Sequence, residues 1–347
     1  MFMKKLIIID GSSMLVTCYY ANLPKEIKEA KTEEERAKNY DKILHAADGT
    51  YTNAVYSMLG TIIRLIKNQK PEYICVCFDQ TRNTFRRELY EDYKGQRAAS
   101  PHPLIEQFST MEHILEELGF AVIYDHTYEA DDWAGSITNK FKNEVSIKLM
   151  SKDHDYLQLV DDNVMVWMML NKDKYEKLKE SIYDRDGVDV KALNLPYRIF
   201  EYTKEYVKEL EGVWAKQIPD LKAIVGDTSD NIPGVKGVSS AAVPLLNEYK
   251  TVERLYEVIE ACNEKELKEL TKYWKNTLGI KRSPLKALTR KPESDEDIVG
   301  KKAALLSKQL ATIKTDIPIP FSLEDMKAEY SDDKLKEICS KYDIKTI

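Results

Sequence analysis

Short apolar runs recur along the first half of the chain, and several of them end at an aspartate. KKLIIID predicts a buried strand that ends at Asp10, and YICVCFD predicts a second strand that ends at Asp79. FAVIY predicts a third strand. Alternating apolar residues over 145–149 predict a fourth strand that leads into Asp153, and residues 164–169 predict a fifth. The strand ends therefore carry carboxylates repeatedly.

Helical patterns separate these strands. Apolar residues at helical spacing fill 55–66 before Pro71, and a second helix begins near Pro103, with Gly119 suited to its C-terminal cap. Residues 130–142 also predict a helix. Strands that alternate with helices are typical of a mostly parallel sheet flanked by helices, which binds ligands at the carboxyl ends of its strands.

The pattern changes along the chain. We predict an α/β core over residues 1–170, in which the charged segment 25–48 is a solvated helix or excursion. Residues 171–199 are charged and irregular, and we interpret them as an insertion or linker. Beyond them the pattern predicts helices and no strand, with a helical domain over 200–325 and a helical tail over 326–347.

Composition narrows the class of protein. The 347 residues are 43% hydrophobic and 32% charged, which is typical of a globular protein. The net charge of −6 argues against binding nucleic acid by bulk charge alone. Five scattered cysteines without CxxC spacing indicate free thiols in a reducing compartment, and no apolar run reaches membrane-spanning length. We expect a cytoplasmic protein, monomeric and not associated with a membrane.

Acidic residues gather at the expected ligand-binding edge of the sheet. They come from four groups of segments: Asp10 and Asp79; Glu129, Asp131 and Asp132; Asp153 and Asp155; Asp227 and Asp230. Singly, helix capping or a turn explains each one. Together, such carboxylates resist ionisation unless cations neutralise them. Oxygen-rich sites suit Mg²⁺ or Mn²⁺, and two ions roughly 3.5–4 Å apart fit in-line phosphodiester cleavage.

A phosphatase of the haloacid-dehalogenase type also begins with a strand that ends in Asp. Its chemistry requires Asp-x-Asp, because the second carboxyl group protonates the leaving group. This chain has Asp10-Gly11-Ser12 instead, so the sequence argues against that class.

Five blocks occur in the order found in the 5′ nuclease family, which includes the 5′-3′ exonuclease domain of bacterial DNA polymerase I and the flap endonucleases. The blocks are IIIDGSS, VCFDQTRNTFRRELYEDYKGQR, YEADDWAGSI, SKDHDYLQLV and GDTSDNIPGVKG. The resemblance runs from residue 4 to about 260 and resumes weakly at 305–319. It implies a PIN-like core, a helical arch around 80–102 and a C-terminal helical domain that contains a helix-three-turn-helix element.

The resemblance also implies roles for the acids. It assigns the first metal ion to Asp10, Asp79, Glu129, Asp131 and Asp132. It assigns the second to Asp153, Asp155, Asp227 and Asp230. Every acid of both sets is present in this chain, which favours an active enzyme.

The predicted arch interleaves basic residues, among them Arg82 and Arg86, with aromatic ones. Such a segment binds phosphates and stacks on unpaired bases, although a solvated helix with internal ion pairs is an alternative. The resemblance places Lys94 and Arg97 at the scissile phosphate, where cations stabilise developing charge, and Arg86 near the same site. Tyr19 or Tyr20 resembles the position on which a terminal base stacks. Core packing is the alternative for both tyrosines.

The loop GVKG, residues Gly234, Val235, Lys236 and Gly237, resembles the family's duplex-binding hairpin, and the family suggests a K⁺ ion at its carbonyls. Two departures follow from the comparison. Thr17 stands where an arginine is usual, and SSAAV replaces the usual start of the next helix, which removes a lysine. We expect Ser239 or Ser240 to cap that helix. Pro244 is tolerable there if it lies in the first turn.

The leading hypothesis is a two-metal 5′-3′ exonuclease or 5′-flap endonuclease. It would act on DNA at 5′ flaps, 5′ ends and nicked or gapped duplexes. Two alternatives remain open. One is a non-catalytic protein that binds DNA structures with the same fold, and the departures at Thr17 and the hairpin favour it. The other is a PIN-like RNA nuclease, which the downstream hairpin argues against.

Overall fold

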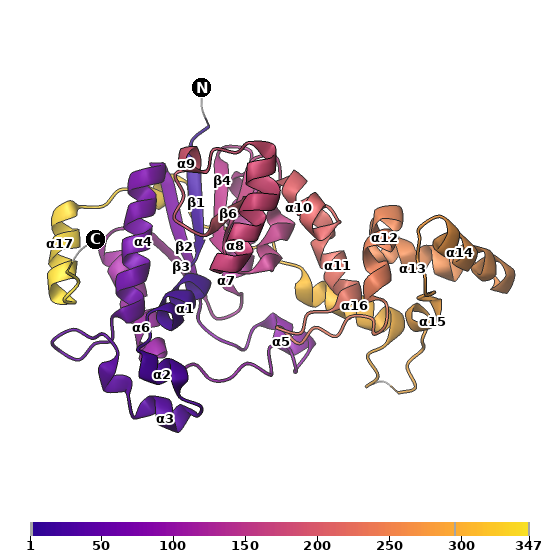
Figure 1. Ribbon diagram of the computed structural model, residues 1–347, viewed down its shortest axis with the longest axis horizontal. Coiled ribbons are helices and arrows are strands. Elements are labelled where there is room, and N and C mark those ends of the chain that lie inside the picture. Colours follow the sequence, from indigo (N-terminus) through magenta and orange to yellow (C-terminus); the bar gives the residue numbers. More distant parts are fainter. Residues whose placement is uncertain (1–2, 295, 346–347) are drawn as a thin grey trace.

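A computed structural model describes residues 3–294 and 296–345. Its sheet has the strand order β3-β2-β1-β4-β5-β6, and all neighbours run parallel except β5 and β6. The strands are β1 Lys5–Asp10, β2 Tyr73–Asp79, β3 Ala121–Asp125, β4 Ser146–Ser151, β5 Val164–Met169 and β6 Ile199–Tyr202. The mostly parallel sheet flanked by helices is thus as predicted (Figure 1).

Two layers of helices cover the sheet. The first half contains α1 Gly11–Ala21, α2 Lys25–Glu29, α3 Glu33–Ala37, η1 Tyr40–Lys42, α4 Asn53–Gln69, α5 Phe85–Leu89, α6 His102–Glu117, α7 Ala130–Phe141 and η2 His154–Leu159. Helix α7 packs on one face of the sheet, and α1, α4 and α6 pack on the other. Gly119 follows α6 with a φ of 86°, as its predicted capping role requires.

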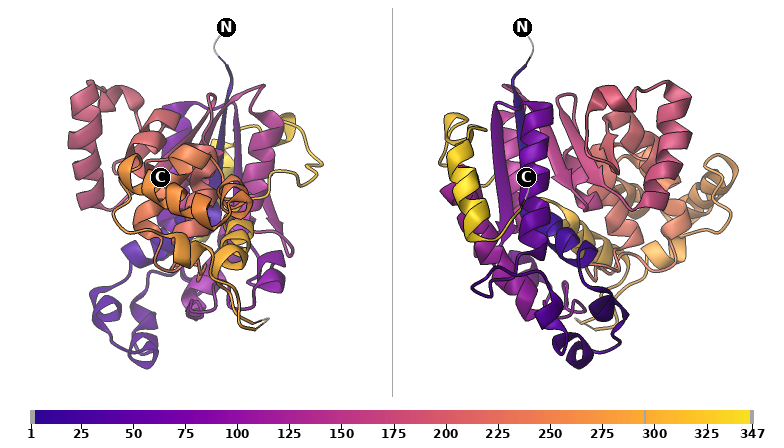
Figure 2. Two further views of the ribbon diagram at one scale, coloured as in Figure 1. Left: turned by 90° about the vertical axis from the view of Figure 1, so that its right-hand side faces the viewer. Right: turned by 60° about the vertical axis from the view of Figure 1, so that its left-hand side comes forward.

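The rest of the chain is mainly helical. Its elements are α8 Lys172–Leu178, η3 Lys179–Asp184, α9 Val190–Leu193, α10 Lys204–Glu211, η4 Ala215–Gln217, α11 Ile218–Val225, α12 Ser239–Tyr249, α13 Val252–Ala261, α14 Glu264–Asn276, α15 Leu285–Leu288, α16 Gly300–Ala311, η5 Glu324–Met326 and α17 Asp332–Lys341. Helices α11 to α16 project to one side of the sheet (Figure 1). The C-terminal α17 returns to the layer that contains α4 and α6 (Figure 2).

Two predictions about secondary structure in the middle of the chain are wrong, namely the irregular conformation of residues 171–199 and the absence of a strand after them. Residues 171–199 are largely helical, with Tyr175, Ile182 and Tyr183 buried. The chain then forms β6, although no strand was expected there. Tyr183 stacks on Phe200 of β6 with ring centroids 4.5 Å apart. A four-residue edge strand shows no long alternation, and its stability comes from pairing with β5 and from this aromatic contact, so its own sequence pattern is weak.

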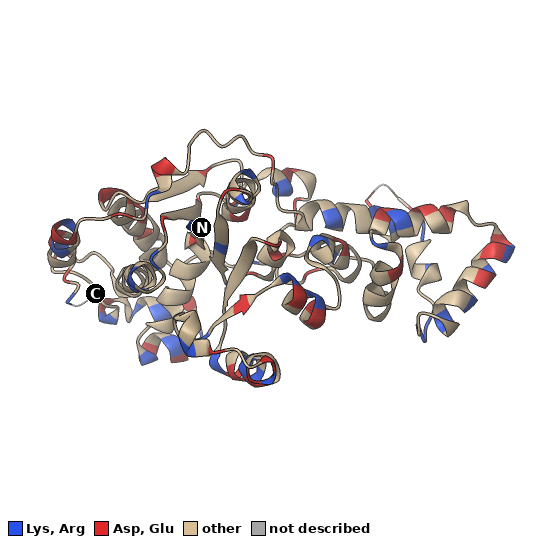
Figure 3. Ribbon diagram, turned by 90° about the horizontal axis from the view of Figure 1, so that it is seen from above, with Lys and Arg blue, Asp and Glu red and all other residues tan. Residues whose placement is uncertain are grey.

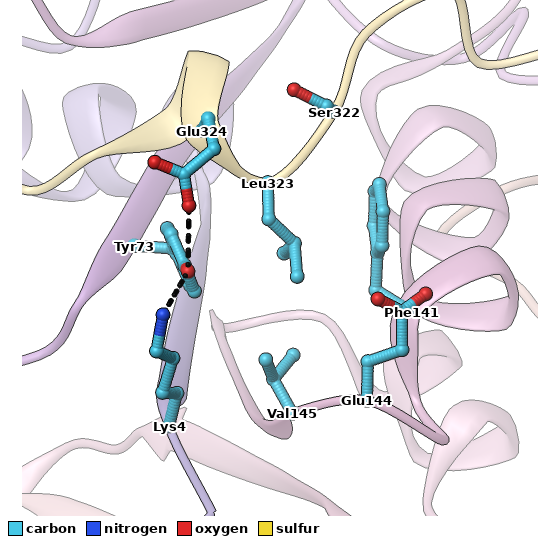
Figure 4. Close-up of a pocket in the computed structure, with 8 residues that line it drawn as sticks. All are labelled: Lys4, Tyr73, Phe141, Glu144, Val145, Ser322, Leu323 and Glu324. Atoms are coloured by element: carbon cyan, nitrogen blue, oxygen red, sulfur yellow. Dashed lines mark hydrogen bonds between the residues drawn. The ribbon is translucent and has the colours of Figure 1, made fainter.

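A pocket of about 430 Å³ lies at the end of the sheet where β1 and β2 begin. Figure 4 shows Lys4 donating to the Tyr73 hydroxyl group at 2.9 Å, which donates in turn to Glu324 at 3.2 Å. The predicted acids lie at the opposite ends of these strands. This pocket is therefore separate from the predicted site. No helix within residues 3–294 and 296–345 is long and apolar enough to cross a membrane.

Candidate active site

Three neighbouring strands bring the first acids together. Asp10 ends β1 and Asp79 ends the adjacent β2, while Asp153 follows β4 on the other side of β1. Asp10 accepts hydrogen bonds from the Ser151 hydroxyl group at 2.6 Å and from the Ser13 backbone at 2.9 Å. Burial, followed by the nearby charge of Asp79, raises the pKa of Asp10 to about 7. This edge of the sheet therefore disfavours additional negative charge unless a cation is present.

The start of α7 contributes the next group. Glu129 is its N-cap residue and accepts a hydrogen bond from the Thr84 hydroxyl group at 2.8 Å. Although burial opposes ionisation, Lys94 and Arg86 lower the pKa of Glu129 to about 2. Asp131 differs, because its Oδ1 atom is buried without a hydrogen-bond partner in the described residues. Burial raises the pKa of Asp131 well above its usual value.

Asp132 lies in the interior, where Arg86 holds it with two parallel hydrogen bonds of 2.7 and 2.8 Å. Its two oxygens also accept the backbone N–H groups of Glu129 and Lys314. Arg86 is 1% exposed, and its remaining hydrogen bonds go to the carbonyl groups of Leu310 and Thr312. In this structure Arg86 and Asp132 connect α5, α7 and the end of α16.

The remaining acids surround a lysine that the sequence analysis did not identify. Lys222 of α11 lies between Asp155, with which it forms an ion pair, and Asp227 at 2.6 Å. Against the effect of burial, Lys222 and Ser229 hold the pKa of Asp227 at about 2. Asp230 is buried and pairs with Arg97 at 2.5 Å. The fold thus brings this second group of acids to the same region as the first.

The basic segment 80–102 contacts the loop that carries Asp227 and Asp230. Lys94 pairs with Glu129 and lies 3.8 Å from Asp230, whose carbonyl oxygen accepts the Lys94 backbone N–H group at 2.9 Å. The buried Tyr93 hydroxyl group reaches Asp230 at 3.3 Å. Lys94 and Arg97 therefore both contact the acids, while the Arg97 side chain also remains 46% exposed.

Arg82, Tyr19 and Tyr20 occupy different environments. Arg82 donates to the carbonyl groups of Arg97 and Ala98, so it braces the segment 80–102. Tyr19 is buried, and its hydroxyl group has no hydrogen-bond partner among the described residues. Tyr20 is 51% exposed and packs edge-on against Tyr19 at 5.2 Å. Of the two tyrosines, only Tyr20 presents a ring to solvent.

The hairpin loop is fixed by close backbone packing. Gly234 has a φ of 59°, and a Cβ atom there would lie 2.3 Å from the Gly226 nitrogen. Its N–H group donates to Ser307 of α16 at 2.9 Å, while the buried Val235 bonds to the Ile224 carbonyl group. Lys236 and Gly237 are exposed. The loop therefore presents its second half to solvent.

The prediction that Ser239 or Ser240 caps α12 is wrong. Val238 occupies the N-cap position, and no side-chain hydrogen bond caps the helix. Both serines are exposed within the first turn. Pro244 is the sixth residue of α12 and lies beyond the first turn, so the helix lacks the hydrogen bond that this residue would donate to the Ser240 carbonyl group.

The acids fit divalent cations in their chemistry, because every donor is a carboxylate oxygen and the buried Asp131 Oδ1 atom accepts no hydrogen bond within the described chain, with Arg86 3.8 Å away. As they stand, no three acidic, histidine or cysteine side chains in residues 3–294 and 296–345 form a ready metal site. The reason is visible in the contacts: Lys94 and Lys222 lie between the carboxylates. These two ammonium groups provide compensating positive charge beside the acids.

Three supporting residues escaped the sequence analysis. Lys222, Thr84 and Ser151 each contact a predicted acid directly. Thr84 and Ser151 lie within the quoted blocks VCFDQTRNTFRRELYEDYKGQR and SKDHDYLQLV, but a single hydroxyl residue gives no sign of which acid it contacts. Lys222 could have been noticed, since it lies five residues before Asp227 in the helix that leads into the acidic loop.

This arrangement of an acidic sheet edge, a basic segment and an appended helical hairpin defines a class of nuclease fold. The sequence matches the family of the 5′-3′ exonuclease N-terminal resolvase-like domain over residues 5–192. It matches the 5′-3′ exonuclease C-terminal SAM fold over residues 213–334. The chain therefore belongs to the 5′-3′ exonuclease family.

Relatives occur both as stand-alone proteins and within larger ones. The 5′-3′ exonuclease of Aquifex aeolicus is 30% identical, with 99% of this chain and 94% of that protein aligned. The 5′-3′ exonuclease of Bacillus subtilis is 32% identical over 73% of each chain. DNA polymerase I of Caldicellulosiruptor bescii is 34% identical over 99% of this chain, which spans about a third (33%) of that protein.

Solved structures show the same fold at low identity. The T5 5′-exonuclease with bound zinc ions aligns with a TM-score of 0.57 and 19% identity, covering 97% of this chain and 99% of that one. The catalytic core of Rad2 in complex with a DNA substrate aligns with a TM-score of 0.51 and 13% identity, covering 98% and 87%.

Proposed function

We propose that this chain is a divalent-metal-dependent 5′-3′ exonuclease and 5′-flap endonuclease that hydrolyses DNA near junctions of single strand and duplex. The observation that carries the proposal is the meeting of acids from β1, β2, β4, α7 and the loop after α11 with Lys94 and Arg97. Family membership supports it. The named activities of the relatives and the DNA in the Rad2 complex are consistent with it.

Two groups of acids would hold the metal ions, Mg²⁺ or Mn²⁺. Asp10, Asp79, Glu129 and Asp131 would serve one ion. Asp132, which the resemblance also assigns to this ion, uses both oxygens to bind Arg86 and backbone N–H groups, so we assign it instead to holding the Glu129 backbone. A second group would serve the other ion: Asp153, Asp155, Asp227 and Asp230. The chemistry supplied by such a pair is a lowered pKa for the attacking water and stabilisation of the leaving oxygen.

The side chains of the segment 80–102 would then bind the substrate. Lys94 pairs with Glu129, and Arg97 pairs with Asp230. Both cations lie beside the acids proposed to hold the metal ions, where they would bind the scissile phosphate and stabilise developing negative charge. Ser151 and Ser13 keep the Asp10 carboxylate oriented throughout. The exposed ring of Tyr20 is placed to stack on an unpaired base.

The hairpin would hold the duplex side of the junction. Lys236, Gly237, Ser239 and Ser240 are exposed, and the N–H groups of Ser239 and Ser240 have no partner among the described residues. Gly234 and Val235 shape the loop from its buried side, and hairpin carbonyl groups are the proposed K⁺ ligands. We further propose that residues 1–170 form the nuclease core and 200–325 the DNA-binding part.

A mapped cleavage assay tests the proposal. A labelled 5′-flap duplex is incubated with the purified chain and Mg²⁺ or Mn²⁺, with EDTA as the metal-free condition. We expect cleavage near the junction only with metal. Asp153→Asn should reduce the rate by about 10²–10³-fold, the scale typical of losing one electrostatic catalytic contact. Asp173→Asn, an exposed acid on α8, is the control and should leave the rate unchanged.

Intact flap and nicked substrates under all metal conditions would contradict the proposal. That result, with binding retained, would favour the non-catalytic alternative, in which Lys94, Arg97 and Lys222 simply remain paired with the acids. A parallel RNA flap distinguishes the remaining possibility. Faster cleavage of the RNA strand than of the DNA strand would identify an RNA nuclease.

A further inference from the structure

The most basic stretch of the chain lies outside the predicted site. Residues 281–291, KRSPLKALTRK, contain five cations and no acid, although the whole chain carries a net charge of −6. The cations are Lys281, Arg282, Lys286, Arg290 and Lys291, and all five are exposed. We call residues 281–291 the distal basic segment. None of these residues was assigned a role by the motifs.

The charges of the distal basic segment are largely unpaired. Within the described residues, only Arg290 has an electrostatic partner, Asp297. Nearby cations behave differently: Lys301 pairs with Glu260 at 2.7 Å, and Lys308 pairs with Asp220 at 2.7 Å. Along the helices in the ribbon of Figure 3, Lys and Arg positions are intermixed with Asp and Glu positions. Unpaired cations that lie close together repel one another. A surface that carries several of them therefore points to an anionic binding partner.

Buried residues and a close backbone contact hold the backbone of this segment in place. Pro284 and Leu288 are buried, and Ile280 just before the segment is also buried. Gly300, at the start of α16, has a φ of 54° and packs so closely that a Cβ atom would lie 2.2 Å from the Arg290 carbonyl oxygen. The cations are therefore displayed from a fixed backbone, which lowers the conformational entropy lost on binding.

Helix α16 relates this segment to the hairpin and to the candidate site. The distal basic segment packs at its first residue, Gly300. Ser307 receives the Gly234 N–H group of the hairpin, and Leu310 accepts a hydrogen bond from Arg86. At about 1.5 Å per residue, Gly300 lies about 10 Å from Ser307 along the helix axis. That distance equals about three base pairs of duplex, since phosphates recur every ~3.4 Å along each strand.

Figure 1 shows α15 and the connection after it on the lower side of the C-terminal helices, the side on which α5 also lies. From the candidate site outward, the segment 80–102, the hairpin and the distal basic segment thus contact α16 in that order, at Leu310, Ser307 and Gly300. A DNA duplex that is bound at the hairpin and extends away from the candidate site would next lie beside the distal basic segment.

We propose that the distal basic segment is a second phosphate-binding surface, which holds the backbone of the duplex arm about three base pairs beyond the hairpin. This inference rests on the proposed DNA substrate. It assigns to the segment a sequence-independent, salt-sensitive contact that compensates for the hairpin helix α12, whose first turn contains no basic residue. Phosphate contacts of the distal basic segment would thereby compensate for the lack of a basic residue in the first turn of α12.

The test is binding measured without catalysis. The full chain in EDTA is titrated into a fluorescent 5′-flap duplex, and Kd is measured by anisotropy over a series of salt concentrations. A variant replaces Lys281, Arg282, Lys286, Arg290 and Lys291 with Gln. We expect its Kd to rise about 10–100-fold near 0.1 M salt, with the slope of log K against log salt shallower by about 2–4, because fewer counterions are released.

A matched control removes the same charge elsewhere. It replaces five exposed cations of α4, α8 and α9 and the residue after α4: Lys67, Lys70, Lys172, Lys177 and Lys191. Within the described residues none of these lysines has an acidic partner either, and none belongs to the segment 80–102, the hairpin or the helices α11 to α16. The control should bind like the unmodified chain. Circular dichroism melting of both variants verifies that each remains folded.

The length of the duplex arm gives a second readout. On an arm of ~20 base pairs the variant should bind more weakly than the unmodified chain, and on an arm of ~4 base pairs the difference should vanish, because the short arm ends before the distal basic segment. Equal Kd values and equal salt slopes for the folded variant and the control would overturn the inference. In that case the segment would serve another anionic partner, such as an acidic protein surface.

Failure of this inference differs from failure of the proposed function. If the unmodified chain cleaves flaps with metal but the variant binds DNA normally, only the distal contact is wrong. If the unmodified chain neither cleaves nor binds the flap duplex, both proposals fall.

Discussion

Adjacent carboxylates in this chain have different environments. Asp131 has an oxygen without a hydrogen-bond partner in the described residues, whereas Asp132 uses both oxygens to bind Arg86 and two backbone N–H groups. The sequence alone does not distinguish these two consecutive aspartates. Their difference arises because successive residues of a helix point about 100° apart, so one faces the acidic edge and the other faces Arg86 and the end of α16.

This contrast predicts that Arg86 is mainly a structural residue. Arg86→Gln would leave Asp132 buried without its cation, so we expect the free energy of unfolding to fall by about 3–5 kcal/mol. Denaturant unfolding measures the change. Its neighbour on α5, Arg87, bonds only to Asn83, and Arg87→Gln should change stability by less than about 1 kcal/mol. Equal effects of the two substitutions would contradict the structural role.

A second residue-scale prediction concerns pH. Burial, opposed by a hydrogen bond from Gln80 and aided by the charge of Glu116, raises the pKa of Glu112 to about 7. A carboxyl group with a raised folded-state pKa favours folding fully below its unfolded pKa, near 4.5, and loses that contribution as pH rises through 7. Glu112→Gln should therefore stabilise the protein at pH 8 more than at pH 5.

The gain in the free energy of unfolding from Glu112→Gln should be about 1–2 kcal/mol larger at pH 8 than at pH 5. It is no larger because partial exposure screens the ionised form. Denaturant unfolding at the two pH values, in EDTA, gives the measurement. Glu106→Gln is a control on the same helix, since the Glu106 carboxylate accepts a backbone N–H group from Tyr51 and has no reason to gain stability at pH 8. A Glu112 variant that is no more stable than the unmodified chain at pH 8 would refute the prediction.

At the scale of elements, the hairpin shows how loop geometry and charge combine. The loop turns back on the end of α11 through the close approach of Gly234 to Gly226, and Asn231 supports it by bonding to the Asp92 carbonyl group. The same loop carries Asp230, so its backbone positions a candidate metal ligand as well as a duplex contact. Asp230 and the duplex-binding part of the hairpin, which are close in sequence, are thus held at a fixed distance from each other by the loop backbone.

The element-scale prediction separates two glycines of this hairpin. Gly234→Ala combines a positive φ with a backbone clash, so we expect it to cost more than about 2 kcal/mol of stability and to weaken duplex binding. Gly237→Ala also has a positive φ, but a Cβ atom there meets nothing within 4 Å. It should cost about 1 kcal/mol. Thermal unfolding and duplex titration compare them, and similar losses would show that the close approach is unimportant.

At the scale of the whole molecule, segments far apart in sequence contact one another around the candidate site and the sheet. The end of α16 accepts hydrogen bonds from Arg86, and the following residues contact α7 through Lys314 and Asp132. The C-terminal α17 buries Leu335 and Ile338 against the layer of α4 and α6. The candidate site is therefore assembled from both halves of the chain, and α16 orders the arch segment, the hairpin and the distal basic segment along one axis.

The sequence by itself determined the parallel α/β core and the family. Long apolar runs that end in Asp10 and Asp79 specify strands and place carboxylates at the same edge, because parallel strands share that edge. The order of the acidic blocks carried the resemblance. These features are local in sequence, or depend only on strand direction, so pattern alone reveals them.

Only the tertiary structure decided which groups meet. The strand β6 forms because β5 and Tyr183 lie beside it, and Lys222 pairs with Asp155 because α11 passes the turn after β4. Val238, rather than a serine, is the N-cap residue of α12, and Pro244 lies in the second turn of this helix. Each outcome depends on contacts between residues far apart in sequence or on backbone geometry at a single residue, and neither leaves a periodic signal in the chain.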